Sequence, residues 1–221
     1  INSLNIEEPF TSLQTQGMVC HQTFKTKEEK WVFPSEIVKR GKEYFHSETK
    51  EPVIAGRIEK MSKSKKNVVD PQQIIEDFGA DTARFFMLSD SPPNRDMEWS
   101  DSGVEGSWRF LNKIWKFVRN LPNRNTKYEL PTNISIQNKE LLTFMNATIK
   151  NVTKAIDEFH FNIAVAQIRS LFNVVFAHKI ENDDDSKVVL FVTSKLLVLI
   201  NPMVPHIAEE LWYILGNKNS I

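Results

Sequence analysis

The sequence predicts a mainly α-helical protein, in which a small β-rich N-terminal part precedes an antiparallel helical bundle. Short apolar groups typical of strands are confined to the first 58 residues. From residue 70 onward, helix-capping residues precede apolar residues spaced three and four apart. Prolines and glycines separate these helical segments by short loops, which favours antiparallel neighbours.

The N-terminal part predicts three short strands, at residues 16–20, 31–33 and 52–55. Between residues 25 and 55 the chain is dense in Lys and Glu, so this stretch predicts a small surface module rather than part of a main core. Cys20 is the one cysteine of the 221 residues, which excludes an intramolecular disulfide framework and favours a reducing compartment.

Three helices are expected next. Asp70 is the predicted N-cap of the first, with Pro71 at its first position and Gly79 at its end. Asp81 is the predicted cap of a second helix that ends at Ser89. A capping box at 102–105 begins the third, with Ser100 as an equally good cap.

Residues 101–221 predict the bundle. The third helix carries one continuous apolar stripe, made of Val104, Trp108, Leu111, Trp115 and Val118. After an irregular stretch at 122–135, further helices are expected at about 137–158, 162–179, 185–201 and 205–215, with Asn162 as a cap. The segment 188–200 is the most apolar, so its helix should be the most central.

Charge and hydropathy limit the compartment and the partners expected for the protein. Lys+Arg and Asp+Glu both total 28, so no net field steers the chain toward nucleic acid or anionic lipid. The apolar run at 188–200 is shorter than the roughly 20 residues that cross a bilayer. The chain starts at Ile1 without a signal peptide. We therefore expect a cytoplasmic protein without a membrane partner, as part of a longer chain.

One loop carries the chemistry. Lysines alternate with small hydroxyl residues between an expected strand and a capped helix, in the segment Lys60-Met61-Ser62-Lys63-Ser64-Lys65-Lys66-Asn67. Ammonium groups converging on one anion suit a polyphosphate, because they offset charge on its oxygens and on a departing pyrophosphate. The alternative is a solvated basic loop.

The pentapeptide at 60–64 is identical to the KMSKS signature of class I aminoacyl-tRNA synthetases. Along most of its length the chain most resembles bacterial leucyl-tRNA synthetases, at residues 9–19, 79–93 and 98–111. Residues 201–212 resemble the ending shared by several class Ia synthetases, so they support the class more than the amino acid. The resemblance implies that residues 1–58 end an α/β nucleotide-binding (Rossmann-like) catalytic domain with a small insert at about 25–55. It further implies that 59–100 hold the KMSKS loop and stem-contact helices, and that 101–221 form an anticodon-binding-type bundle.

The function implied by the resemblance is ATP-dependent activation of leucine to leucyl-adenylate, followed by transfer to tRNA(Leu). The implied catalytic residues are Lys63, which contacts the phosphates most directly, and Lys60. The implied ATP-binding set is Lys60, Met61, Ser62, Lys63 and Ser64. Gly17 and Met18 are candidates for the border of the adenylate pocket, with plain core packing as the alternative. Mg²⁺ is expected with ATP, but no Asp/Glu cluster has convincing ligand spacing.

Basic residues suggest where RNA binds. No acid occurs between Gly106 and Tyr128, and Arg109, Lys113 and Lys116 share one helix face in this stretch, with Arg124 and Lys127 beyond them. They predict a ridge that follows tRNA phosphates, with a merely solvated face as the alternative. Further candidates for contact with the acceptor stem are Lys65, Lys66 and Arg84, although Arg84 suits a structural salt bridge equally well.

One departure limits the chain on its own. The family needs a HIGH-type motif whose histidines stabilise ATP phosphates, and the five histidines here form no H-x-G-H pattern. We therefore expect no leucine activation by this chain alone. Separately, we expect the parent enzyme to be monomeric. Alternatives are another class Ia specificity (isoleucyl, valyl or methionyl), a non-catalytic tRNA- or RNA-binding helical module, and a basic-faced scaffold.

Overall fold

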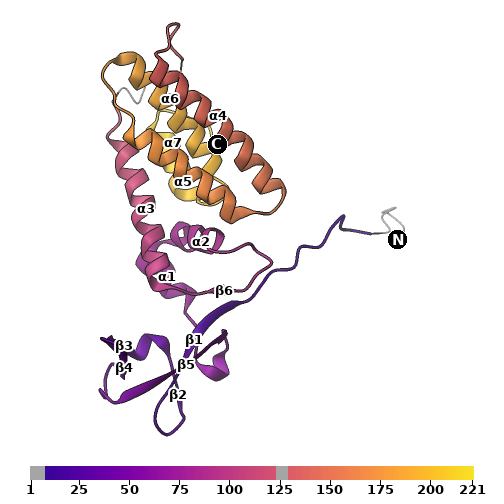
Figure 1. Ribbon diagram of the computed structural model, residues 1–221, viewed down its shortest axis with the longest axis vertical. Helices are drawn as coiled ribbons and strands as arrows, with labels where there is room; N and C mark the ends of the chain where they lie inside the picture. The colour runs from indigo at the N-terminus through magenta and orange to yellow at the C-terminus, as the bar shows by residue number, and fades with distance from the viewer. Residues whose placement is uncertain (1–7, 123–128) are drawn as a thin grey trace.

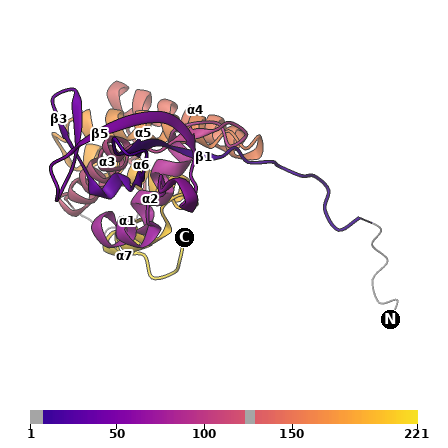
Figure 2. The same cartoon turned by 90° about the horizontal axis from the view of Figure 1, so that it is seen from below.

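The structure is a computed structural model that describes residues 8–122 and 129–221. A curled sheet lies at one end of the molecule and a helical bundle at the other, joined by the long helix α3 (Asp101–Arg119) (Figure 1). The segment before the first strand projects away from the body in both views (Figure 2). This arrangement agrees with the predicted fold, a β-rich N-terminal part followed by helices.

The sheet has the strand order β2-β1-β5-β4-β3, with β6 pairing with β1 outside this path. Its neighbours are antiparallel except for the parallel pair β1 and β6. The strands are β1 (Val19–Lys25), β2 (Trp31–Val32), β3 (Ile37–Arg40), β4 (Glu43–His46), β5 (Pro52–Lys60) and β6 (Met97–Glu98). Phe24, Val32 and Val53 form its small buried core.

The strand predictions need correction in two ways. The first strand lies at Val19–Lys25 rather than at 16–20, because its backbone pairs with β5 although its side chains there are mostly polar. Strands β3 and β4 were not predicted at all. Their residues are exposed or half-buried, with charges at Lys39, Arg40 and Glu43, and they form strands by pairing, β3 with β4 and β4 with β5.

Seven helices lie in the described ranges, together with two short 3₁₀ turns. Besides α3 they are α1 (Pro71–Phe78), α2 (Ala80–Ser89), α4 (Ile136–Asp157), α5 (Phe161–Ala177), α6 (Asp183–Ile200) and α7 (Pro205–Ile214). The 3₁₀ turns are η1 (Pro34–Glu36) and η2 (Lys63–Lys65). The expected irregular stretch at 122–135 lies partly outside the described residues, as do Arg124 and Lys127.

The helix starts test the predicted caps. Asp70 caps α1, with its Oδ1 accepting from the N–H of Gln72 at 2.9 Å. Ser100 caps α3, with its Oγ accepting from the N–H of Gly103 at 3.2 Å, so the predicted capping box at 102–105 is wrong and the cap offered beside it is confirmed.

Two predicted caps are wrong for a different reason. Gly79 ends α1 as predicted, and with a φ of 85° it is also the N-cap of α2, so Asp81 lies inside that helix with its carboxylate turned toward α7. Asn162 lies in the first turn of α5, whose N-cap residue is His160. In both cases the local pattern offered a suitable side chain one or two residues after the true start.

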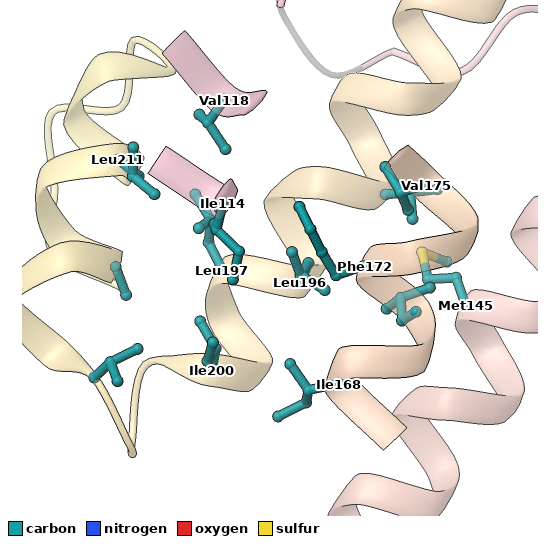
Figure 3. Close-up of a cluster of buried hydrophobic side chains, with 14 of the residues drawn as sticks. Ile114, Val118, Met145, Ile168, Phe172, Val175, Leu196, Leu197, Ile200 and Leu211 are labelled. Atoms are coloured by element: carbon teal, nitrogen blue, oxygen red, sulfur yellow. The ribbon is translucent and has the colours of Figure 1, made fainter. Parts of the chain in front are cut away.

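The bundle core is apolar, and Figure 3 shows side chains of α3, α4, α5, α6 and α7 gathered in it. As predicted, α6 is the most central helix, because buried residues occur all around it. Ile114, Phe172 and Leu196 are among the side chains with at most 1% exposure. Trp108 departs from the predicted stripe: it is 43% exposed and meets the Phe78 ring edge-on.

The helices give no sign of a membrane span. Within residues 8–122 and 129–221, none combines the length and apolarity that crossing a bilayer requires.

Candidate functional site

The basic loop follows directly from β5, which carries Lys60 as its last residue. Met61 extends the pairing of β5 with β1, since its N–H donates to the carbonyl oxygen of Val19 at 3.0 Å. The chain then makes the turn η2, and Lys66 ends it with a left-handed φ of 54°. The sheet therefore fixes both the point where the loop begins and its direction.

Asn67 holds this loop in shape from inside. Its side chain is fully buried, and its Nδ2 lies 3.1 Å from the carbonyl oxygens of His21 and Glu59 and 3.3 Å from that of Lys60. Its Oδ1 accepts from the N–H of Ser62 at 2.8 Å. Sequence reasoning missed this role, because a single Asn after a lysine run is typical of an exposed turn.

The four lysines of the loop differ in their surroundings. Lys65 forms an ion pair with Glu59, and the ammonium of Lys66 lies 4.9 Å from the centre of the Phe33 ring. Lys60 and Lys63 are exposed, and no carboxylate of a described residue lies within ion-pair distance of either. The two lysines predicted to be catalytic are thus the two that remain available to an anion.

A cleft of about 790 Å³ adjoins the loop on the side of Lys63. It is lined by His21, Lys63 and residues 33–35, 68–71, 73–74 and 101. Its volume is in the range of small-molecule sites. Ser62 and Ser64 join their hydroxyls at 2.6 Å across the loop, which ties its backbone without using any lysine.

Gly17 and Met18 lie beside the segment before β6. A Cβ on Gly17 would lie 2.0 Å from the carbonyl oxygen of Arg95, so only glycine fits there. The N–H of Met18 donates to Asp96 Oδ1 at 2.8 Å, and the Met18 residue is 45% exposed. Both residues therefore help to place β6 beside β1. That they border an adenylate pocket stays a prediction.

No metal centre is evident in the part of the chain that the structure describes. There, no three His, Cys, Asp or Glu residues gather closely enough to hold an ion.

The candidate RNA contacts fall into two groups. Arg84 is engaged within the protein, because Nε donates to the carbonyl oxygen of Met203 at 3.0 Å and Nη2 to that of Pro202 at 2.9 Å. Arg109 pairs with Glu105 at 3.7 Å on an exposed helix face.

The other two residues of the predicted ridge have different neighbours. Lys113 lies over the Phe176 ring, 4.0 Å from its centre. Lys116 is exposed, and no described carboxylate is within ion-pair distance of it. Of the predicted ridge, Lys116 is thus the least engaged with the rest of the protein.

Two family models match the chain. "tRNA synthetases class I (I, L, M and V)" matches residues 44–100, which include the basic loop, and "Anticodon-binding domain of tRNA ligase" matches residues 138–221. Together they cover the loop and most of the bundle.

The relatives agree with these models. The leucine--tRNA ligase of Paramagnetospirillum magneticum is 44% identical over 97% of this chain. That of Rickettsia prowazekii is 43% identical over the full length of this chain. The chain spans about a quarter of the length of these relatives, 25% and 26% respectively.

Solved structures give the same picture for the fold. The LeuRS–tRNA–LeuAMS ternary complex of Agrobacterium radiobacter K84 matches 97% of the chain and 24% of that protein, with a TM-score of 0.72 and 25% identity. Methionyl-tRNA synthetase of Mycobacterium tuberculosis in complex with methionyl-adenylate matches 72% of the chain and 36% of that protein, with a TM-score of 0.58 and 21% identity.

Proposed function

We propose a function from the premise that this chain belongs with the leucine--tRNA ligases among the class I tRNA synthetases, as its relatives and family models show. In the enzyme that contains it, the chain supplies the phosphate-binding loop for activation of leucine by ATP. It also supplies a helical surface for tRNA(Leu). The enzyme acts as a monomer in the cytoplasm.

The availability of Lys60 and Lys63 carries this proposal. In leucine activation, a carboxylate oxygen of leucine attacks the α-phosphorus of ATP, and the bond to the pyrophosphate oxygen breaks. Negative charge then grows on the departing pyrophosphate. An ammonium group already fixed beside that position stabilises the charge without reorganising, and Asn67 provides this fixation through the loop backbone.

Two features support separate roles for the lysines. Lys63 lines the cleft beside the loop, so we assign it to the phosphates, with Lys60 at the end of β5 assisting. Met61, Ser62 and Ser64 complete the ATP-binding loop. Mg²⁺ accompanies ATP, but the described residues offer it no cluster of ligands, and we derive no step through the ion.

The second step transfers the leucyl group to the terminal adenosine of tRNA(Leu). The matched anticodon-binding domain and the exposed basic residues of α3 support binding of the tRNA along the bundle. We expect this contribution to weaken with salt, because it rests on neutralised phosphates. Lys65 and Lys66 remain candidates for the acceptor stem.

The experiment is leucine-dependent exchange of pyrophosphate into ATP by the full-length synthetase that contains this chain. Lys63→Ala should slow exchange by about 10²–10³-fold, the usual effect of removing one preorganised contact. Lys65→Ala is the matched control, because Glu59 already holds that ammonium, and it should slow exchange far less. Equal effects of the two variants would contradict the proposal. The 221-residue chain alone should show no exchange.

A further inference from the structure

A second hollow lies away from the basic loop, where α3 and α5 meet the C-terminal end of α2. Helix α2 packs against both of the others at this junction (Figure 1). The hollow holds about 400 Å³. Its α5 wall is formed by Asn162, Val165, Ala166 and Arg169, and the spacing of these residues places them on one helix face.

The α3 wall is open because its residues are small. Gly103, Gly106 and Ser107 face the hollow, again at helical spacing. A Cβ on Gly103 would lie 2.6 Å from Phe86 Cε2, so this glycine lets the helices approach. A Cβ on Gly106 would meet no atom of the described residues within 4 Å, so the absence of a side chain there leaves the space free.

Arg169 brings a positive charge into this space. Its guanidinium carbon lies 4.5 Å from the centre of the Phe110 ring and 5.0 Å from that of Phe85, and the two rings stack on each other. No carboxylate in the described ranges lies within ion-pair distance of it. Burial lowers the pKa of Arg169, as expected for a partly desolvated cation without a counter-ion.

Two more features of α5 suit an anion. Asn162 lines the hollow, and within the described residues no hydrogen bond to its buried Oδ1 fixes the orientation of the amide, whose NH₂ group is the donor that an anion needs. Asn162 also lies in the first turn of α5, where the helix dipole favours negative charge. Asp90 opposes this, since its carboxylate lines the same hollow and accepts a hydrogen bond from Ser91 Oγ at 2.9 Å.

We infer that this hollow is a phosphate-binding site, in which Arg169 and Asn162 hold one phosphate group in the space beside Gly106. The guanidinium supplies several N–H donors in a fixed plane, which matches the oxygens of a phosphate. The inference rests on the proposed function for its ligand, a backbone phosphate of the bound tRNA. It adds contacts that the basic ridge of α3 does not contain.

Binding of tRNA(Leu) by the full-length synthetase tests the inference over a range of salt concentrations. Arg169→Gln should weaken binding about 10-fold and reduce the slope of log K against log salt by about 1. Gly106→Leu should weaken it similarly by filling the space without changing charge. Asp90→Asn should tighten binding, because it removes the opposing charge. Lys150→Gln, which removes an exposed positive charge on α4, is the matched control and should change the affinity least.

A second arm distinguishes tRNA from free phosphate. Inorganic phosphate should raise the melting temperature of the wild type more than that of Arg169→Gln, and protection by phosphate without any change in tRNA affinity would assign the site to a free phosphate. Wild-type tRNA affinity in all three site variants, with no selective protection by phosphate, would overturn the inference. Failure of the proposed function is separate, since it would appear as absent ATP–pyrophosphate exchange in the wild type. Circular dichroism would verify that each variant is folded.

Discussion

Asp81 on α2 caps a helix that begins more than a hundred residues later. Its Oδ2 accepts a hydrogen bond from the N–H of Ile207 at 2.7 Å, in the first turn of α7. Its Oδ1 lies 2.8 Å from Nδ1 of His206. Three residues further along α2, Arg84 donates to the carbonyl oxygens of Pro202 and Met203, which lie just before α7. Through Asp81 and Arg84, helix α2 therefore connects the segment after the basic loop to the start of α7 in the bundle.

The first prediction concerns this cap. Asp81→Ala should lower the free energy of unfolding by about 1–2 kcal/mol, because the Ile207 N–H at the start of α7 loses its acceptor. Urea unfolding of the 221-residue chain measures this. Asp77→Ala is the control, since that residue is exposed and its carboxylate accepts a hydrogen bond from Gln73 on the same helix, and it should change stability by less than about 0.5 kcal/mol. Equal losses in the two variants would contradict the capping role.

The same contact explains why one sequence prediction failed. The order Gly-Ala-Asp-Thr satisfies the local rule for a helix cap, and the pattern placed Asp81 at the start of α2. However, the residue before α7 is Val204, which has no side-chain acceptor, so that helix takes its cap from another part of the chain. A local rule cannot anticipate such a long-range use of a side chain.

The elements that were predicted well are those whose signals are local. Asp70 and Pro71 mark the start of α1, and the apolar run of α6 marks the centre of the bundle. Strands β3 and β4 gave no such signal, because none of their residues is fully buried; they form by pairing, β3 with β4 and β4 with β5. Secondary structure that depends on a partner strand is invisible in a single segment.

The candidate site shows the same division. The basic loop stood out because its residues match a family signature, and the structure leaves Lys60 and Lys63 unpaired by any described carboxylate. The residue that shapes the loop, Asn67, bonds to three carbonyl oxygens, two from β5 and one from β1. The sequence order does not reveal that these strands face each other around it.

The second prediction tests Asn67. Asn67→Asp keeps the acceptor for Ser62 but replaces the amide donor with an oxygen facing three carbonyl oxygens. Stability should fall by about 2–3 kcal/mol, because buried acceptors are left without a donor. ATP–pyrophosphate exchange by the full-length enzyme should fall as well, since the lysines lose their fixed position. Asn94→Asp, in an exposed loop, should leave both measurements near the wild-type values.

The third prediction concerns pH. Burial raises the pKa of Asp185, but hydrogen bonds from Asn138 and the Glu181 N–H and the nearby His178 outweigh it, so the pKa is lowered from its usual 3.8. A lowered pKa stabilises the fold above 3.8, and this stabilisation disappears as the pH falls through the folded-state pKa.

Urea unfolding at several pH values measures this effect. Asp185→Ala should cost about 1–3 kcal/mol at pH 7, because the Asn138 amide and the Glu181 N–H lose their acceptor. The difference from the wild type should shrink below about pH 4, where the wild type loses the same charge. Asp184→Ala, which removes an exposed partner of Lys187, should cost less than about 1 kcal/mol. A wild-type advantage as large at pH 2 as at pH 7 would contradict the role of the charge.

The fourth prediction compares two glycines that differ in what surrounds them. Gly17→Ala should destabilise the chain by about 1–3 kcal/mol, because its new Cβ would overlap the carbonyl group of Arg95 and separate β1 from β6. Gly106→Ala should stabilise the chain by about 0.5–1 kcal/mol, because alanine favours the interior of α3 and its Cβ meets no atom within 4 Å. Thermal unfolding of both variants measures the two signs directly. Since each substitution adds the same methyl group, opposite outcomes can arise only from local space and backbone geometry. Destabilisation by Gly106→Ala would show that the hollow beside α3 is filled by protein atoms in solution.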